Sequence, residues 1–419
     1  MNIAILGVGT VGTSVVNILK KNKELIRSRS GVEINPVVGV VRDISKKRDC
    51  DIPLTDDIES VINRDDIDVY VELMGGVEKP FKVVSEILKK KKPVVTANKA
   101  MLAYHRYALQ KLAGDTPFGY EASVAGGIPI IKSLREGLSA NSVEKIVGIL
   151  NGTSNYILTD MMKNGSNFAD VLKKAQELGY AEADPTFDVD GWDAAHKLLV
   201  LSSIAYGVHG DPEDILVKGI RKVGSEDIFF AEEFEYVIKL LAISKMTDGK
   251  AELRVHPALI SKDNMLAKVD GVMNAVTVYA DALSESMYYG PGAGGDATAS
   301  AVIADLIDIA KGNKSPMLGY NKELSNIELL PIKDIRTKYY LRVKVEDKKG
   351  VLAKIANVMS ENNISIDSFL QKPRLKDEKY STLFFTTHTS LEADIKRVMG
   401  ILEKTEFVIQ RPFMIRIES

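Results

Sequence analysis

Ile3-Ala4-Ile5-Leu6-Gly7-Val8-Gly9-Thr10-Val11-Gly12 is the stretch that decides the fold of the first part of the chain. Residues 3–6 predict a short buried strand, and the apolar positions that follow Gly12 predict a helix. In this setting a G-x-G-x-x-G pattern is informative, because the glycines permit a tight turn and let a pyrophosphate approach the helix N-terminus. The alternative is a turn that only packs the helix on the strand. We expect a dinucleotide to contact Gly7, Val8, Gly9, Thr10, Val11 and Gly12.

Strands and helices alternate from this stretch to about residue 132, which predicts an open parallel sheet. The second strand, 36–41, ends at Arg42. An arginine there accommodates the extra phosphate of NADP, whereas the neighbouring Asp43 would suit NAD. The fourth strand opens into a polar turn that carries Thr96 and Lys99. Ligands bind beyond the carboxyl ends of such strands, so these two residues are candidates to contact the cofactor; a surface lysine is the alternative for Lys99.

A stretch rich in carboxylates, 179–197, precedes an apolar helical run that begins at Trp192. Asp193 and Lys197 are four residues apart, so they are neighbours if that run is helical. A carboxylate held against an ammonium can keep a proton donor aimed into a cleft. The alternative is a helix N-terminus whose acids complement its dipole. The acidic residues are Glu182, Asp184, Asp188, Asp190 and Asp193.

Three further polar or glycine-rich turns are candidates for binding. Residues 124–129 offer several backbone carbonyls beside Glu121 and could hold a hard monovalent cation; a strand-to-helix corner is the default. In the turn 151–155, either Thr153 or Ser154 caps a helix that opens at Tyr156, or free N–H groups bind a substrate carboxylate or phosphate. The loop 290–298, which contains Gly292 and Gly294, suggests that the chain returns to the cofactor before the helix 301–310; an ordinary loop and helix start is the alternative.

Size and composition restrict the class of protein. The chain has 419 residues, of which 45% are hydrophobic and 27% charged, so we expect two or three domains with real cores. A net charge of −2 argues against nucleic acid or an anionic membrane as the main partner. A single cysteine, Cys50, excludes an internal disulfide framework. No apolar run approaches a membrane span, and no signal sequence is evident. A cytoplasmic location is expected.

The rest of the chain predicts two further units. A second unit starts near residue 133, and helices with short strands are expected between residues 198 and 278. Residues 321–338, with Pro331, are typical of a linker. The final segment, 339–419, reads as strand, helix, two strands, helix and strand, which is a βαββαβ ferredoxin-like order.

These motifs together resemble the homoserine dehydrogenase family, in the form that has no attached kinase and carries a C-terminal ACT domain. The matching segments are 7–12, 95–99, 121–129, 151–158 and 182–197. The resemblance implies an α/β chain of three domains. It would consist of a Rossmann-type dinucleotide-binding domain at 1–132, to which 300–320 returns, a catalytic and dimerisation α+β domain at 133–320, the 321–338 linker, and an ACT regulatory domain at 339–419.

The resemblance also implies an activity and roles for residues. The family interconverts L-aspartate 4-semialdehyde and L-homoserine with NADP or NAD. Lys197 would be the proton donor, Lys99 would polarise the reacting oxygen, and Glu182, Asp193 and Asp188 would bind the substrate. Glu121, Val124, Gly126 and Ile128 resemble the family's sodium site. The ACT domain implies threonine as an effector, through the loop 347–352 and residues 363–364. A homodimer or higher homo-oligomer is expected.

Two other functions are compatible with the pattern. One is a non-catalytic sensor of an amino acid and NADP, which would have no need of Lys197 paired with Asp193. The other is a different semialdehyde or imino-acid reductase. The absence of a catalytic cysteine argues against oxidation of an aldehyde to an acyl intermediate, because Cys50 lies in an early loop.

Overall fold

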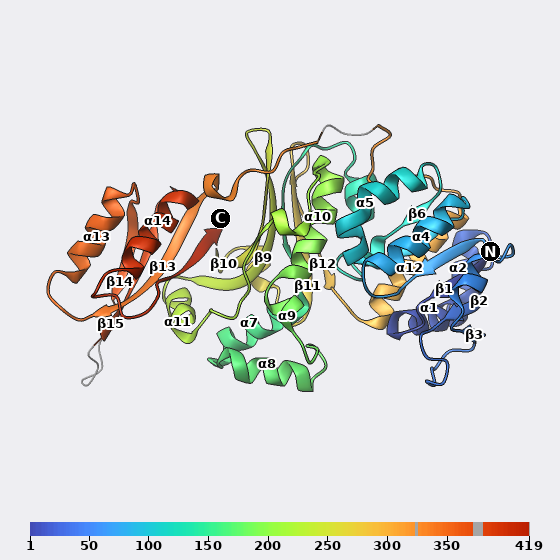
Figure 1. Cartoon of the computed structure of the whole chain (residues 1–419), viewed down its shortest axis with the longest axis horizontal. Coiled ribbons are helices and arrows are strands. Elements are labelled where there is room, and N and C mark those ends of the chain that lie inside the picture. The colour runs from blue at the N-terminus through green and yellow to red at the C-terminus, as the bar shows by residue number, and fades with distance from the viewer. Residues whose placement is uncertain (323–325, 372–379, 419) are drawn as a thin grey trace.

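The computed structural model describes residues 1–322, 326–371 and 380–418 (Figure 1). Parts of the expected linker (323–325) and of the expected C-terminal domain (372–379 and 419) lie outside the described residues. Within the described ranges, no helix has both the length and the apolar character that a membrane span requires.

The first sheet confirms the Rossmann-like prediction. Its six strands are parallel in the order β3-β2-β1-β4-β5-β6. Their central pair, β1 and β4, is buried throughout or nearly so, as expected for a sheet covered by helices on both faces. The strands are β1 (Asn2–Leu6), β2 (Asn35–Val40), β3 (Leu54–Thr55), β4 (Val69–Glu72), β5 (Val94–Thr96) and β6 (Phe118–Gly119).

Six helices and one returning helix accompany this sheet. Helix α12 (Gly295–Ala310) comes from much later in the chain, yet Val302 and Leu306 share a core with Ile5 and Val15. The chain therefore returns to the first sheet after the second unit, as Figure 1 also shows. The other helices are α1 (Thr10–Lys21), α2 (Lys23–Ser30), α3 (Ile58–Ile62), α4 (Glu78–Lys89), α5 (Lys99–Ala113) and α6 (Ile130–Lys132).

The second unit is built on long strands, so the expectation of short strands at 198–278 is wrong. Strands β9 (Tyr236–Thr247) and β10 (Lys250–Ser261) have 12 residues each and form an antiparallel hairpin. Both strands are buried on both faces over most of their length, which removes the alternation of apolar and polar residues. Asp248 and Gly249 form the turn, and both have left-handed backbone. An Asp-Gly pair is a usual sequence signal of a two-residue hairpin turn.

Helices cover the face of this sheet that looks towards the first domain. Helix α10 (Trp192–Tyr206) packs against β7 (Val143–Ile149), β9 and β10, and its side chains are almost all buried. Helix α9 (Thr186–Val189) contacts α10, α7 (Gly152–Asn164) contacts α9, and both α8 (Phe168–Glu177) and α11 (Ser225–Glu233) contact α7. Strands β8 (Leu216–Val217), β11 (Met273–Ala280) and β12 (Ser284–Pro291) complete this part.

The C-terminal segment has the predicted βαββαβ order, but its sheet is not separate. Strand β17 (Phe413–Glu418) pairs in parallel with β10 and antiparallel with β13 (Arg336–Glu346), so one 11-stranded sheet runs through both units. The sequence did not predict this pairing. The remaining elements are α13 (Val351–Glu361), β14 (Ile366–Gln371), β15 (Tyr380–Thr387), β16 (Ser390–Leu391) and α14 (Glu392–Glu403).

Candidate active site

A cavity of about 640 Å³ lies between the carboxyl edge of the first sheet and the helices of the second unit. It gathers residues from segments that are far apart in the sequence. The candidates that line it are Val11, Lys99, Gly126, Glu182, Asp188, Asp193, Lys197, Gly292 and Gly294.

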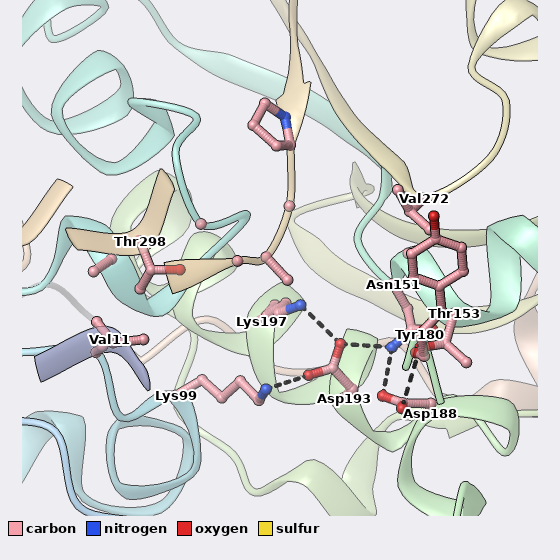
Figure 2. A pocket seen from close by; sticks show the side chains of 18 of the residues that line it. Val11, Lys99, Asn151, Thr153, Tyr180, Asp188, Asp193, Lys197, Val272 and Thr298 are labelled. Carbon is pink, nitrogen blue, oxygen red and sulfur yellow. Dashed lines mark hydrogen bonds and ion pairs between the residues drawn. The ribbon is translucent and has the colours of Figure 1, made fainter. Parts of the chain in front are cut away.

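Asp193 is held between two lysines that come from different domains (Figure 2). Its Oδ2 lies 2.7 Å from Lys197 Nζ, one turn along α10, and its Oδ1 lies 2.6 Å from Lys99 Nζ, at the start of α5. Lys197 Nζ also donates to the carbonyl of Leu150 at 2.7 Å. Two ammonium groups therefore converge on one carboxylate at the wall of the cavity.

Burial sets the titration of this cluster. Asp193 is only 2% exposed and Lys197 7%. Burial raises the pKa of Asp193, but the charges of Lys197 and Lys99 outweigh it and hold that pKa well below its usual range. Burial lowers the pKa of Lys197, against the attraction of Asp193. The charge of Asp193 raises the pKa of Lys99. Lys197 is therefore the lysine better suited to release a proton.

Asn151 is a site residue that the sequence reasoning missed. As the N-cap of α7, its Oδ1 accepts from Ser154 N, while its Nδ2 donates to Asp188 Oδ1 at 2.8 Å and Asp193 Oδ2 at 2.9 Å. The helix therefore begins at Gly152 with Asn151 as its cap, and the expectation of a cap at Thr153 or Ser154 is wrong. The cap residue also joins two carboxylates that would otherwise repel each other. The signal that could have identified Asn151 is an asparagine directly before a helix, where the helix N-terminus lies against an acidic stretch.

The acidic stretch divides into residues that reach the cavity and residues that do not. Glu182 is exposed at its edge, and Asp188 lies deeper, where burial and the charge of Asp193 raise its pKa. Asp184 instead accepts from Thr186 N, and Asp190 pairs with Arg221 at 2.6 Å. Only three of the five carboxylates therefore face the reaction space.

A second cavity, of about 550 Å³, adjoins the first, and Leu73 and Met74 line both. Gly7, Val8, Gly9 and Arg42 line the second cavity, together with Asp56 and the cations Arg48 and Lys79. A side chain at Gly7 would meet the backbone of Leu73 at 2.7 Å, which explains the glycine. Thr10 and Gly12 line neither cavity; Gly12 instead lets α1 pack against the carbonyl of Gly7.

Thr96 does not line either cavity, and its partner Glu72 is a second residue that was missed. Both are fully buried, and Thr96 Oγ1 lies 2.5 Å from Glu72 Oε2. Glu72 also accepts from Met74 N, where the two cavities meet. Burial raises the pKa of Glu72 to about 7, although these hydrogen bonds oppose it. The sequence signal that could have identified Glu72 is a carboxylate at the end of an apolar strand.

The expected cation loop is divided between two roles. The Glu121 carboxylate accepts from Ile131 N at 2.9 Å and Lys132 N at 2.8 Å, so it caps α6. Ala125 and Gly126 both have left-handed backbone, with φ of 56° and 55°. Of the four candidates, Gly126 alone reaches the large cavity. Among the described residues, no cluster of three or more His, Cys, Asp or Glu side chains could hold a metal ion.

The fold and the site define a dinucleotide-binding oxidoreductase, because a Rossmann-like sheet presents its glycine turn beside a buried lysine–carboxylate cluster. Family profiles agree with this class. The homoserine dehydrogenase profile matches residues 129–307, the profile of the homoserine dehydrogenase NAD-binding domain matches 7–117, and the ACT domain profile matches 339–407.

Relatives match over the whole chain. A homoserine dehydrogenase from Helicobacter pylori is 49% identical over 419 residues, which are 100% of this chain and 99% of that protein. One from Neisseria gonorrhoeae is 43% identical, with 100% and 99% covered. The crystal structure of the Thiobacillus denitrificans enzyme superposes with a TM-score of 0.95 at 41% identity, covering 100% and 98%. The chain belongs to the homoserine dehydrogenase family.

Proposed function

We propose that this protein reduces L-aspartate 4-semialdehyde to L-homoserine with NADPH, reversibly, in the biosynthesis of threonine, methionine and isoleucine. The observation that carries the proposal is the Lys99–Asp193–Lys197 cluster, because it presents two cations to a cavity that is continuous with the glycine turn. Reduction of an aldehyde builds negative charge on its oxygen, and cations held in a buried site stabilise such charge.

Lys197 would supply the proton to that oxygen, and Lys99 would polarise it. The cofactor, when bound, supplies the hydride to the aldehyde carbon. Asp193 keeps both ammonium groups in place, and its own negative charge stays fixed because its pKa is held low. In the oxidative direction Lys197 accepts the proton back, which the burial-lowered pKa of its ammonium favours.

The substrate is a zwitterionic amino acid, so it needs a carboxylate for its ammonium and donors for its own carboxylate. Glu182 and Asp188 line the cavity on the side of the second unit and would take the ammonium. Thr153, at the start of α7, lies on the same wall and would contribute to binding the carboxylate.

NADP rather than NAD is favoured by the lining of the second cavity. Arg42 and Lys79 line it, while the carboxylate of Asp43 is engaged by the N–H and hydroxyl of Ser45. Arg48 is occupied in holding the loop, since it donates to the carbonyls of Val8 and Asp43. One relative of 28% identity and TM-score 0.62, a hyperthermophilic archaeal homoserine dehydrogenase, has been solved in complex with NADPH.

A monovalent cation, sodium, would be held at residues 121–128. Because the Glu121 carboxylate already accepts two backbone N–H groups, the ion would rest chiefly on carbonyl oxygens of Val124, Gly126 and Ile128. A carbonyl-lined turn fits such an ion, which has no need of a charged ligand set. Its role here would be to fix the loop that packs, through Gly127 N and Pro291 O, beside Gly292.

The ACT domain would bind threonine and regulate turnover. Its first loop ends at Gly350, in left-handed backbone at the start of α13, and Asn363 has the same backbone after it. These are the loop and turn that the sequence resemblance assigns to an amino-acid effector.

The test is oxidation of NADPH, followed at 340 nm, with L-aspartate 4-semialdehyde, with and without millimolar L-threonine. We expect turnover with NADPH, slower turnover with NADH, and inhibition by threonine. Turnover without inhibition would remove the threonine assignment and keep the reaction. Absence of turnover with both cofactors would contradict the proposed reaction and favour the sensor.

A further inference from the structure

A third cavity, of about 500 Å³, lies at the seam between the second unit and the ACT domain. Its floor is formed where β17 joins β10, at Arg416 and His256, and its walls are α14 and the loop 218–222. It shares no lining residue with the active-site cavity or with the loop 347–352. The cavity is therefore separate from both sites described so far.

The lining of this seam cavity carries a surplus of positive charge. It has three carboxylates, each of which already has a cation: Asp190 with Arg221 at 2.6 Å, Glu403 with Arg411 at 3.3 Å, and Glu392 with Arg416 at 2.5 Å. Three more cations remain. The side chain of Lys396 shares Glu392 with Arg416, at 3.3 Å. Within the described part of the chain, Lys218 and Lys222 form no ion pair.

One cation of the lining, Arg416, is buried rather than exposed on the surface. Arg416 is only 3% exposed and Glu392 is fully buried, so the floor is a fixed ion pair, and both residues line the cavity. Met399, Pro412 and Phe413 add apolar lining beside it. Such a surface suits a ligand that has several negative charges and a short carbon skeleton.

We propose that the seam cavity binds a small, multiply charged anion, namely a phosphate ester or a polycarboxylate. Its cationic rim, Lys218, Lys222 and Arg411, would meet the charges of the anion, and Arg416 would hold one of them at the floor. This binding does not depend on the identity of the reaction at the active site.

The bound anion would also act on the active site, a step that rests on the proposed function. Arg221 joins Asp190 to the hydroxyl of Thr186, at the start of α9. The backbone N–H of Ile220, the residue before Arg221, donates to the carbonyl of Val189 at 2.9 Å. Helix α9 carries Asp188, which bonds to Asn151 in the active site. An anion that draws Arg221 from Asp190 would therefore release α9 and raise the KM for the aldehyde.

The binding test is calorimetric titration of the full chain, saturated with NADP so that the phosphate sites of the cofactor are filled. Pyrophosphate and citrate serve as separate probes, which distinguishes phosphate from carboxylate recognition. The test variant is Lys222→Ala with Arg411→Ala, because both side chains are exposed and their loss should leave the fold intact. The matched control is Lys404→Ala, an exposed lysine that follows α14 and does not line the cavity.

We expect at least one probe to bind the wild type at one saturable site, with affinity reduced at least about tenfold in the double variant, as loss of hydrogen bonds to charged groups implies. The control should stay within about twofold. Failure of both probes to bind the wild type would overturn the proposal, and so would equal affinity in the double variant. Neither result would bear on the proposed reaction, since the readout is heat of binding and not turnover.

Discussion

At the residue scale, the site depends on two lysines that share one buried carboxylate. One carboxylate, Asp193, holds two ammonium groups, so both cations are fixed where an oxyanion in the cavity can meet them. Glu72, at the end of β4, has the opposite balance: it is buried, and within the described part of the chain no cation is among its hydrogen-bond partners. Burial raises the pKa of both acids, but the two lysines reverse the net shift at Asp193 alone.

Glu72→Gln should change how stability depends on pH. The folded-state pKa of Glu72 is about 7, above the ordinary 4.5, so the folded protein binds a proton more tightly than the unfolded chain. Wild-type stability should therefore fall as pH rises from about 4.5 to 7, by roughly 3 kcal/mol for this group. Glutamine mimics the protonated form, so urea unfolding should show the variant gaining on the wild type across that range. A difference that is the same at pH 5 and pH 8 would contradict this account.

At the element scale, the site is fixed by two helix N-termini that meet. Gly191, which has left-handed backbone, directly precedes helix α10. Asp193 and Lys197 then lie on the same side of this helix. Helix α7 begins at Asn151, which caps it and bonds to both acids. The start of α7 and the start of α10 are thus held together by one amide side chain.

Asn151→Ala should therefore lower the free energy of unfolding by more than the loss of an ordinary helix cap does. Asn167 caps α8 in the same way, at an exposed place, and is the matched control. We expect Asn167→Ala to lose about 1 kcal/mol with unchanged kinetics. Asn151→Ala should lose more, and kcat/KM should fall at least about tenfold, because Asp188 and Asp193 lose their shared donor. Denaturation and steady-state assays measure both, and equal behaviour of the two variants would refute the bridging role.

These elements show how much of the site the sequence could predict. Spacing of four residues sufficed to place Lys197 against Asp193, and the strand end at residues 94–96 placed Lys99 at the cavity. Asn151 and Glu72 were missed because their roles come from partners distant in the chain. The same reason applies to the long hairpin β9–β10, whose strands are buried on both faces and so show no alternation, and whose Asp248-Gly249 turn was the one local signal.

At the scale of the whole molecule, the second unit and the ACT domain share one sheet. Arg254 on β10 is 2% exposed and donates to Glu252 at 2.6 Å and to Glu418 on β17. A local pattern predicts the βαββαβ order, but the parallel pairing of β17 with β10 joins residues more than 150 apart in sequence. A ligand at the ACT domain can therefore act on the sheet that carries α10.

Arg254→Met should destabilise the protein strongly, because it leaves Glu252 and Glu418 buried without their cation. The expected loss is about 3–5 kcal/mol. The control is Arg397→Met, which removes an exposed arginine 3.0 Å from Asp394 and should cost at most about 1 kcal/mol. Urea unfolding monitored by circular dichroism measures both. Equal unfolding midpoints for the two variants would mean that the ion pairs of Arg254 with Glu252 and Glu418 do not hold the two units together.

The most direct test of the central claim is the rate of NADPH oxidation by L-aspartate 4-semialdehyde in Lys197→Met, which keeps much of the side-chain volume and removes the ammonium. Lys174→Met is the control, since it removes another lysine 2.7 Å from an aspartate, on a helix away from the cavity. The account predicts that kcat falls by about 10³-fold or more in Lys197→Met, with NADPH affinity within about twofold of wild type and the control unaffected. Turnover within about tenfold of wild type, with NADPH binding intact, would contradict the assignment of Lys197 as the proton donor.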